Sequence, residues 1–380
     1  MLMLRHRHPG SPSSKPGDHE GSGQATLAVT EVQDPPELVG RLRSALQRRG
    51  TVVGLGLVLS GLTVWLTLER VELGRLPTLL SELRVVPLVV AVAIFPVAVW
   101  VKAVQWQRLC YSATSAKLGD LFIATALGLT VNNLAPARLG DVLRVILGAE
   151  LAGLGRAQAA SSILVEKLLD LLSLALLGLA LVPFAPLPWQ LRTAVLMTAL
   201  CSLGGLAGVV VLARRTSASH RWAEYMLARP RFSRLGLTAP LGAALNALRR
   251  FQHPRRLAVP FALSLLHWLL NAAMYHLVLV ALDLSLPPAA AISTLVATNL
   301  GMALPSSPGF IGVFDYLCVV SLSAFGVEPT TALGFAVVVH AFGLFLPPVL
   351  GLVLIGRDGR LRRLLGFDRG ASSFGTAPAG

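Results

Sequence analysis

Six apolar runs in this chain are each long enough to cross the roughly 30 Å hydrocarbon core of a bilayer as a helix. Hydrophobic residues make up 54% of the chain and charged residues 14%, a balance far from that of a soluble domain. The sequence therefore predicts an all-α polytopic membrane protein with about six full transmembrane helices. The runs lie at residues 51–68, 85–104, 157–183, 190–213, 257–283 and 331–355.

Two further apolar regions, residues 119–153 and 286–326, are each interrupted near the middle by Pro, Gly and polar residues. Neither is expected to form one continuous helix. We predict two opposed re-entrant hairpins, with "NNLAPARLGDVLR" at 132–144 and "LPSSPGF" at 304–310 near their tips. Non-helical backbone at membrane depth is tolerated only inside protein or beside a wet cavity, so the polar tips predict a cavity.

The distribution of arginine predicts the orientation of the chain. Residues 214–256 contain ten arginines and one acidic residue, Glu224, and arginines also gather in both tails. Because positive residues are retained on the cytoplasmic side, this loop and both termini are expected to be cytoplasmic. The hairpin at 119–153 would then open to the cytoplasm and the one at 286–326 to the outside. The arginines just before the first run are Arg41, Arg43, Arg48 and Arg49.

Each half of the membrane region has two runs, a hairpin and a third run, which is the order of a possible inverted-topology repeat. Asp141 and Glu166 are 25 residues apart, as are Asp315 and His340. The basic loop is expected to lie on the anionic inner leaflet. The predicted parts are a disordered cytoplasmic tail (1–50), a transmembrane domain (51–355) with halves at about 51–183 and 190–355, the basic loop (214–256) and a cytoplasmic tail (356–380).

The first hairpin carries charges at regular spacing. Arg138, Asp141 and Arg144 would share one face of a helix that starts at Pro136. They could form a closed ion network that pins the hairpin, or the arginines could stay available to an anion such as phosphate. The charged residues of the following run that could join them are Glu166, Lys167 and Asp170.

The second hairpin permits two interpretations as well. Ser306 could cap the following helix, or Ser306, Ser307 and the Gly309 amide could bind a head group. His340 could be a packed, hydrogen-bonded histidine or a proton carrier. The full set of predicted substrate-binding residues is Asn132, Asn133, Pro136, Arg138, Gly140, Asp141, Arg144, Glu166, Lys167, Asp170, Pro305, Ser306, Ser307, Pro308, Gly309, Asp315 and His340.

Other classes of protein find little support in the sequence. The three cysteines are far apart, and the chain has no zinc spacing, P-loop or GxSxG motif. The net charge of +14 is explained better by the positive residues that orient a membrane protein than by nucleic-acid binding. We expect no enzyme activity, no metal, no cofactor and no nucleic-acid partner, and the oligomeric state stays open.

Four motifs in order carry a family resemblance: "NNLAPARLGDVLR", "VEKLLDLLSLALLGL", "ALPSSPGFIGVFDYLCV" and "HAFGLFLPPVLGL". Together they resemble the membrane region of lysylphosphatidylglycerol synthases and the stand-alone flippase-like proteins related to it, over nearly all of residues 51–355. Asp141 and Asp315 stand where that family commonly has Glu, and Lys167 stands where it often has Arg. The resemblance implies a lipid-handling protein of the bacterial inner membrane, here without the soluble aminoacyl-transferase domain.

The expected function is the flipping of an anionic lipid or lipid-linked phosphate through a midplane cavity between the hairpins. One alternative is a non-transporting lipid- or glycolipid-binding partner of a membrane enzyme, and another is a secondary transporter of small solutes. A lateral opening to lipid would favour the first two functions, whereas an enclosed aqueous cavity would favour the third. Aminoacylated phosphatidylglycerol, a polyprenyl-phosphate sugar and a hopanoid-type lipid all fit the sequence.

Overall fold

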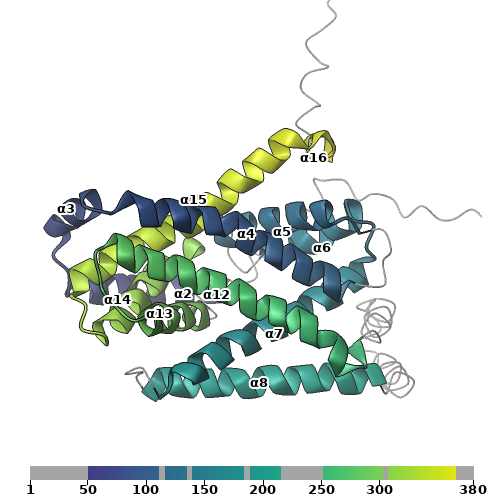
Figure 1. Ribbon diagram of the computed structural model, residues 1–380, viewed down its shortest axis with the longest axis horizontal. Helices are drawn as coiled ribbons and strands as arrows, with labels where there is room; N and C mark the ends of the chain where they lie inside the picture. The colour runs from purple at the N-terminus through teal and green to yellow at the C-terminus, as the bar shows by residue number, and fades with distance from the viewer. Residues whose placement is uncertain are drawn as a thin grey trace, which may run out of the picture. The chain divides into compact units, whose positions relative to one another are not determined.

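The computed structural model describes residues 50–110, 116–134, 139–183, 189–214, 251–302 and 307–364 (Figure 1). Most of these residues are helical, the others lie in turns and short connecting segments, and none of them is in a β-strand. The chain divides into the units Met1–Gly50 and Thr51–Gly380, and the helices belong to the second. The predicted tails, nearly all of the basic loop, and Pro136, Arg138, Pro305 and Ser306 lie outside the described residues.

All six apolar runs form long helices, as the sequence predicts. Four of them, α4, α8, α12 and α15, are long and apolar enough to cross a membrane. Helix α7 is of similar length but carries four charged residues, whose partners are described below. The bounds are α2 (Gly50–Leu68), α4 (Val85–Leu109), α7 (Arg156–Leu181), α8 (Trp189–Arg214), α12 (Ala258–Ala281) and α15 (Pro329–Arg357).

The two interrupted regions each form a pair of shorter helices. Helix α5 (Leu118–Leu134) packs against α6 (Leu139–Glu150), and α13 (Pro288–Gly301) packs against α14 (Val313–Ser323). The 3-10 turn η5 (Pro308–Phe310) precedes α14. Each region therefore folds back on itself as a hairpin must, while its depth in the membrane stays a prediction.

Glycine allows the two helices of the first hairpin to approach closely. A Cβ added to Gly140 would overlap the backbone oxygen of Gly128, and one added to Gly128 would overlap the side chain of Arg144. The Arg144 side chain thus passes over Gly128 at the point of contact. Glycine at both positions sets the separation between α5 and α6.

Short elements connect the long helices. The 3-10 turn η1 (Leu73–Arg75) and α3 (Leu76–Ser81) join α2 to α4, and η4 (Pro254–Leu257) leads into α12. After α15, the short helix α16 (Gly359–Leu364) returns to the first hairpin. There the Arg360 Nη2 lies 2.6 Å from Asp120 Oδ1 at the start of α5.

Contacts between the two halves are reciprocal. Helices α4 and α12, the second long helix of each half, pack together. The first hairpin helix of each half packs on the last long helix of the other half, since α5 contacts α15 and α13 contacts α7. In Figure 1, α8 lies alongside α7. This reciprocity is the pattern that a two-fold-related repeat would produce.

Large apolar side chains are exposed along several long helices. On α8, Leu200 is 63% exposed, and on α15 Phe345 and Leu352 are 66% and 68% exposed. Continuous apolar faces of this kind are rare on soluble monomers but are expected where helices contact lipid.

Candidate functional site

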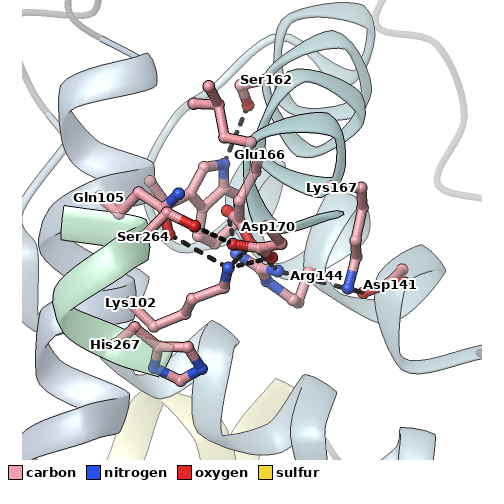
Figure 2. A network of polar contacts seen from close by, with 12 residues as sticks. Lys102, Gln105, Asp141, Arg144, Ser162, Glu166, Lys167, Asp170, Ser264 and His267 are labelled. Carbon is pink, nitrogen blue, oxygen red and sulfur yellow. Dashed lines mark hydrogen bonds and ion pairs between the residues drawn. The ribbon is translucent and has the colours of Figure 1, made fainter. Parts of the chain in front are cut away.

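A buried ion pair joins the first hairpin to α7 (Figure 2). Arg144 Nη1 and Nη2 donate to Glu166 Oε1 and Oε2, both at 2.8 Å. The two side chains are 3% and 0% exposed. The guanidinium also lies 4.5 Å from the centre of the Trp106 ring, whose Nε1 donates to Ser162 Oγ at 2.9 Å. A guanidinium suits such a two-pronged pair stacked on an aromatic ring.

Lys102 of α4 extends this network toward α12. Its Nζ lies 3.1 Å from Glu166 Oε1, donates to Gln105 Oε1 at 3.1 Å and also contacts the carboxylate of Asp170. The other oxygen of Asp170 accepts a hydrogen bond of 2.7 Å from Ser264 Oγ. Side chains from α4, α6, α7 and α12 thus meet in one cluster, which Figure 2 shows together.

Asp141 lies at the more exposed edge of the network. Its Oδ1 is 3.2 Å from Lys167 Nζ, accepts from Asn132 Nδ2 at 3.3 Å and is 4.0 Å from Arg144 Nη1. The predicted residues that the structure brings together here are Asn132, Asp141, Arg144, Glu166, Lys167 and Asp170. Gly140 belongs to the same region as the packing contact between α5 and α6.

Within the described residues the network has three cations and three carboxylates: Lys102, Arg144, Lys167, Asp141, Glu166 and Asp170. Its formal charge is therefore balanced. A buried charge is tolerated when it is paired, and removing one partner is costly because the other is left uncompensated. This geometry supports the structural interpretation of Arg144, whereas the anion-binding role of Arg138 stays a prediction.

A second cluster forms around His340 of α15. Its Nδ1 is 3.1 Å from Asp315 Oδ1 on α14, and its Nε2 is 2.6 Å from the carbonyl oxygen of Gly309. The other carboxylate oxygen of Asp315 accepts from the Gly312 amide at 2.9 Å, which closes the start of α14. Gly309, Asp315 and His340, which were predicted separately as substrate-binding residues, are thus brought together.

The turn before α14 is held by further hydrogen bonds. The Ser307 amide donates to Ser60 Oγ of α2 at 2.9 Å, and the Ser307 hydroxyl donates to the Ile311 carbonyl at 3.1 Å. Gly309 and Gly312 have φ of 73° and 88°, values that favour glycine. The Ser307 hydroxyl is therefore used within the turn, and the predicted roles of Ser306 and Pro305 fall outside the described residues.

A central cavity of about 250 Å³ lies between the two hairpins, α4, α12 and α15. Of the predicted residues, Asn133, Gly309 and His340 line it, while Arg144, Glu166 and Asp170 do not. Polar side chains that sequence analysis did not select also line it. These are His267 and Asn271 of α12, Tyr275 of α12 and Asn299 of α13.

A second hollow of about 430 Å³ lies between α2, the start of α14 and α15, and we call it the lateral groove. Its lining is almost wholly apolar, with Asp315 and His340 as its ionisable residues among those described. Ile311 and Phe345 are 54% and 66% exposed beside it. His340 and Leu344 line both the central cavity and the groove, so the two spaces share a wall.

Several residues of the ion network and the cavity were not predicted, although the sequence contains features that point to them. Lys102 is the one charged residue within the run at 85–104, and an ionisable group inside a membrane span is a candidate for function or pairing by itself. His267 and Asn271 stand four residues apart in the run at 257–283, which places them on one helix face. Ser264, by contrast, is an ordinary small residue of a membrane helix, and its bond to Asp170 leaves no mark in the sequence.

Comparison with known proteins adds one match. Residues 53–351 match the family described as the lysylphosphatidylglycerol synthase TM region, a range that covers both hairpins and nearly all of the six long helices. No curated protein and no solved structure matches the chain. The motifs, the apolar helices and this match agree, and the chain belongs to the lysylphosphatidylglycerol synthase TM region family, as a multi-pass membrane protein.

Proposed function

We propose that this protein translocates a lipid across the cytoplasmic membrane, with the head group in the central cavity and the acyl or isoprenoid chain in the lateral groove. The shared wall of His340 and Leu344 is the observation that carries the proposal. A lipid has a polar end and an apolar end, and adjoining polar-lined and apolar spaces suit such a molecule. No chemical step is assigned to either space.

The lateral groove favours a lipid over a small solute. A water-soluble substrate needs only the polar-lined cavity, whereas the groove offers an apolar surface beside exposed Ile311 and Phe345. The same two spaces would also serve a protein that binds a lipid and presents it to an enzyme. Translocation is therefore the property that separates the two lipid functions.

The first hairpin would bind the phosphate of the lipid. Arg144 is committed to Glu166 and Trp106 and is 3% exposed, which argues against a direct role in binding an anion. Arg138 belongs to the same motif, six residues earlier. We assign the phosphate of an anionic lipid or lipid-linked phosphate to Arg138 and give Arg144 the task of holding the hairpin.

Reconstitution into vesicles tests the proposal. Vesicles made with fluorescent phosphatidylglycerol, with and without the protein, are treated with a membrane-impermeant quencher, and native mass spectrometry identifies lipids that copurify. Protein-dependent loss of the protected fluorescence is expected. Copurified lipid without translocation would favour the lipid-presenting partner. The absence of both lipid binding and translocation would contradict a lipid-handling function.

A further inference from the structure

We infer that the central cavity takes an uncharged, polyhydroxylated head group, such as a glycerol or a single sugar ring. This inference rests on the proposed lipid translocation and names the part of the lipid that enters the cavity. The observation behind it is a cluster of three asparagine side chains from three helices, Asn133, Asn271 and Asn299, in a wall without charged side chains other than histidine.

The cavity wall offers little to pair with a strongly charged group, since its one ion-paired side chain among the described residues, His340, is already engaged with Asp315. Among the lining residues that the structure describes, none is Lys, Arg, Asp or Glu. The nearby charges of Lys102 and Asp170 are engaged with each other in the ion network. Moving a charged group into such a site would be unfavourable without a compensating partner. A neutral group that forms hydrogen bonds avoids this cost.

The three amides are oriented by backbone contacts. Asn133 Nδ2 donates to the Gly343 carbonyl, Asn271 Nδ2 to the His267 carbonyl at 2.8 Å, and Asn299 Nδ2 to the Leu295 carbonyl at 2.9 Å. An amide nitrogen must face a carbonyl oxygen, so each Oδ1 is the opposite atom. None of these three oxygens has a hydrogen-bond partner within the described part of the chain. They supply three acceptors.

Donors are present as well, in smaller number. His267 Nδ1 lies 3.0 Å from the Ala98 carbonyl, so this nitrogen carries the proton. The unprotonated Nε2 then accepts from Asn271 Nδ2 at 3.3 Å, which uses the second N–H of that amide. Asn133 and Asn299 each keep one N–H that has no partner among the residues the structure describes. Hydroxyl groups both donate and accept, so this mixture of neutral acceptors and donors matches a polyol.

Size and apolar lining point the same way. The cavity volume of about 250 Å³ lies below the range of about 300 to 1,000 Å³ typical of sites for drug-sized ligands. Aromatic rings line it from four helices and one turn, and they offer flat apolar faces to the C–H groups of a sugar or glycerol. The aromatic lining residues are Phe95, Trp268, Tyr275, Phe310, Phe314 and Phe342.

Four fluorescent lipids with identical acyl chains test this inference in reconstituted vesicles. Monoglucosyl diacylglycerol and phosphatidylglycerol carry free hydroxyls, whereas phosphatidylserine and phosphatidylethanolamine carry ammonium groups. We expect the first two lipids to be translocated at least about tenfold faster than the other two, since several hydrogen bonds distinguish them. Equal rates for all four, or faster transport of phosphatidylserine, would overturn the inference and leave translocation intact.

A matched pair of variants locates the effect. Asn299→Leu removes an amide whose only described bond is to its own helix, so the fold should persist. Ser293→Ala on the same helix removes a buried hydroxyl that does not line the cavity. Asn299→Leu should slow the glucosyl lipid about tenfold, and Ser293→Ala should leave it unchanged. An unchanged rate in Asn299→Leu would contradict the assignment.

Binding separates failure of this inference from failure of the proposed function. If no lipid is translocated, native mass spectrometry of the detergent-solubilised protein with glucosyl lipid and phosphatidylserine still gives an answer. Preferential retention of the glucosyl lipid, lost in Asn299→Leu, would support the head-group assignment without transport. Preferential retention of phosphatidylserine would reject it.

Discussion

At the scale of single residues, the most consequential contact is the two-pronged pair between Arg144 and Glu166. Both groups are almost fully buried, and Glu166 also contacts Lys102. Their geometry supports a structural role for Arg144 in the first hairpin. Asp141 and Lys167 pair at the more exposed edge of the same network. The charged residues of this motif therefore differ in burial, and anion binding is predicted for Arg138 and not for Arg144.

Arg144→Ala should destabilise the protein by about 3 to 5 kcal/mol, because it removes one partner of a buried ion pair. Thermal unfolding of the purified protein in detergent measures the loss. Arg156→Ala is the control, since the Arg156 side chain is 75% exposed and its pair with Glu150 is long, at 3.9 Å. The control should change stability by less than about 0.5 kcal/mol. Equal stability of the two variants would show that the network does not hold the hairpin.

Arg138→Lys should sharply reduce translocation of fluorescent phosphatidylglycerol while expression and unfolding temperature stay close to those of the parent. Lysine keeps the charge but loses the planar guanidinium that binds phosphate with two hydrogen bonds. Vesicle transport and thermal unfolding are measured on the same preparation. Full translocation by Arg138→Lys would move the phosphate contact elsewhere in the site.

At the scale of helices, close backbone contact decides whether the first hairpin can form. Gly128 and Gly140 face each other, and the Arg144 side chain crosses at the same place. The hairpin is therefore held by two features at once, a tight backbone approach and the buried ion pair. Neither feature depends on the apolar character of α5.

Gly140→Ala should destabilise the protein by about 1 to 3 kcal/mol, because the new methyl group would overlap the Gly128 carbonyl oxygen. Gly119→Ala is the control on the same hairpin, since nothing lies within 4 Å of a Cβ at that position. Alanine there should be neutral or slightly stabilising. If both variants unfold at the same temperature in detergent, the close approach of α5 and α6 is not needed.

The sequence predicts the helices better than it predicts their contacts. The apolar run ends at residue 104, but helix α4 continues to Leu109. Gln105 and Trp106 are polar or amphipathic, and tertiary packing buries both of them within the helix. Hydropathy alone ends the helix too early. The charges also predicted that Asp141 and Arg144 could share a network with Glu166, Lys167 and Asp170, and the structure brings these residues together. Lys102 and Ser264 join that network from α4 and α12, and this depends on tertiary packing.

At the scale of the whole molecule, the two halves have the same order of elements, and corresponding helices of the two halves make corresponding contacts with the other half. Residue pairs with the same 25-residue spacing take part in a polar cluster in each half. Asp141 and Glu166 both contact Arg144, and Asp315 contacts His340. A repeat with inverted topology would place these clusters in opposite leaflets.

Cysteine labelling tests that topology. A Glu328→Cys substitution at the start of α15 should react with a membrane-impermeant maleimide added from outside intact cells, because the arginine bias predicts that this loop lies outside. Cys201→Ser serves as the background, since Cys201 is exposed while Cys110 and Cys318 are buried. Labelling of the new cysteine only after the cytoplasmic side is opened would contradict the inverted repeat.

If one lipid occupies the central cavity and the lateral groove together, a bulky side chain in their shared wall should block its passage. Leu344→Trp enlarges a side chain that lines both spaces, whereas Leu352→Trp places the same ring on an exposed face of the same helix. Translocation of fluorescent phosphatidylglycerol is measured for both, after matched unfolding temperatures have been established. Leu344→Trp should slow translocation at least tenfold, about the loss expected from one displaced contact, and Leu352→Trp should leave the rate unchanged. Equal, undiminished rates in both variants would contradict this joint occupancy.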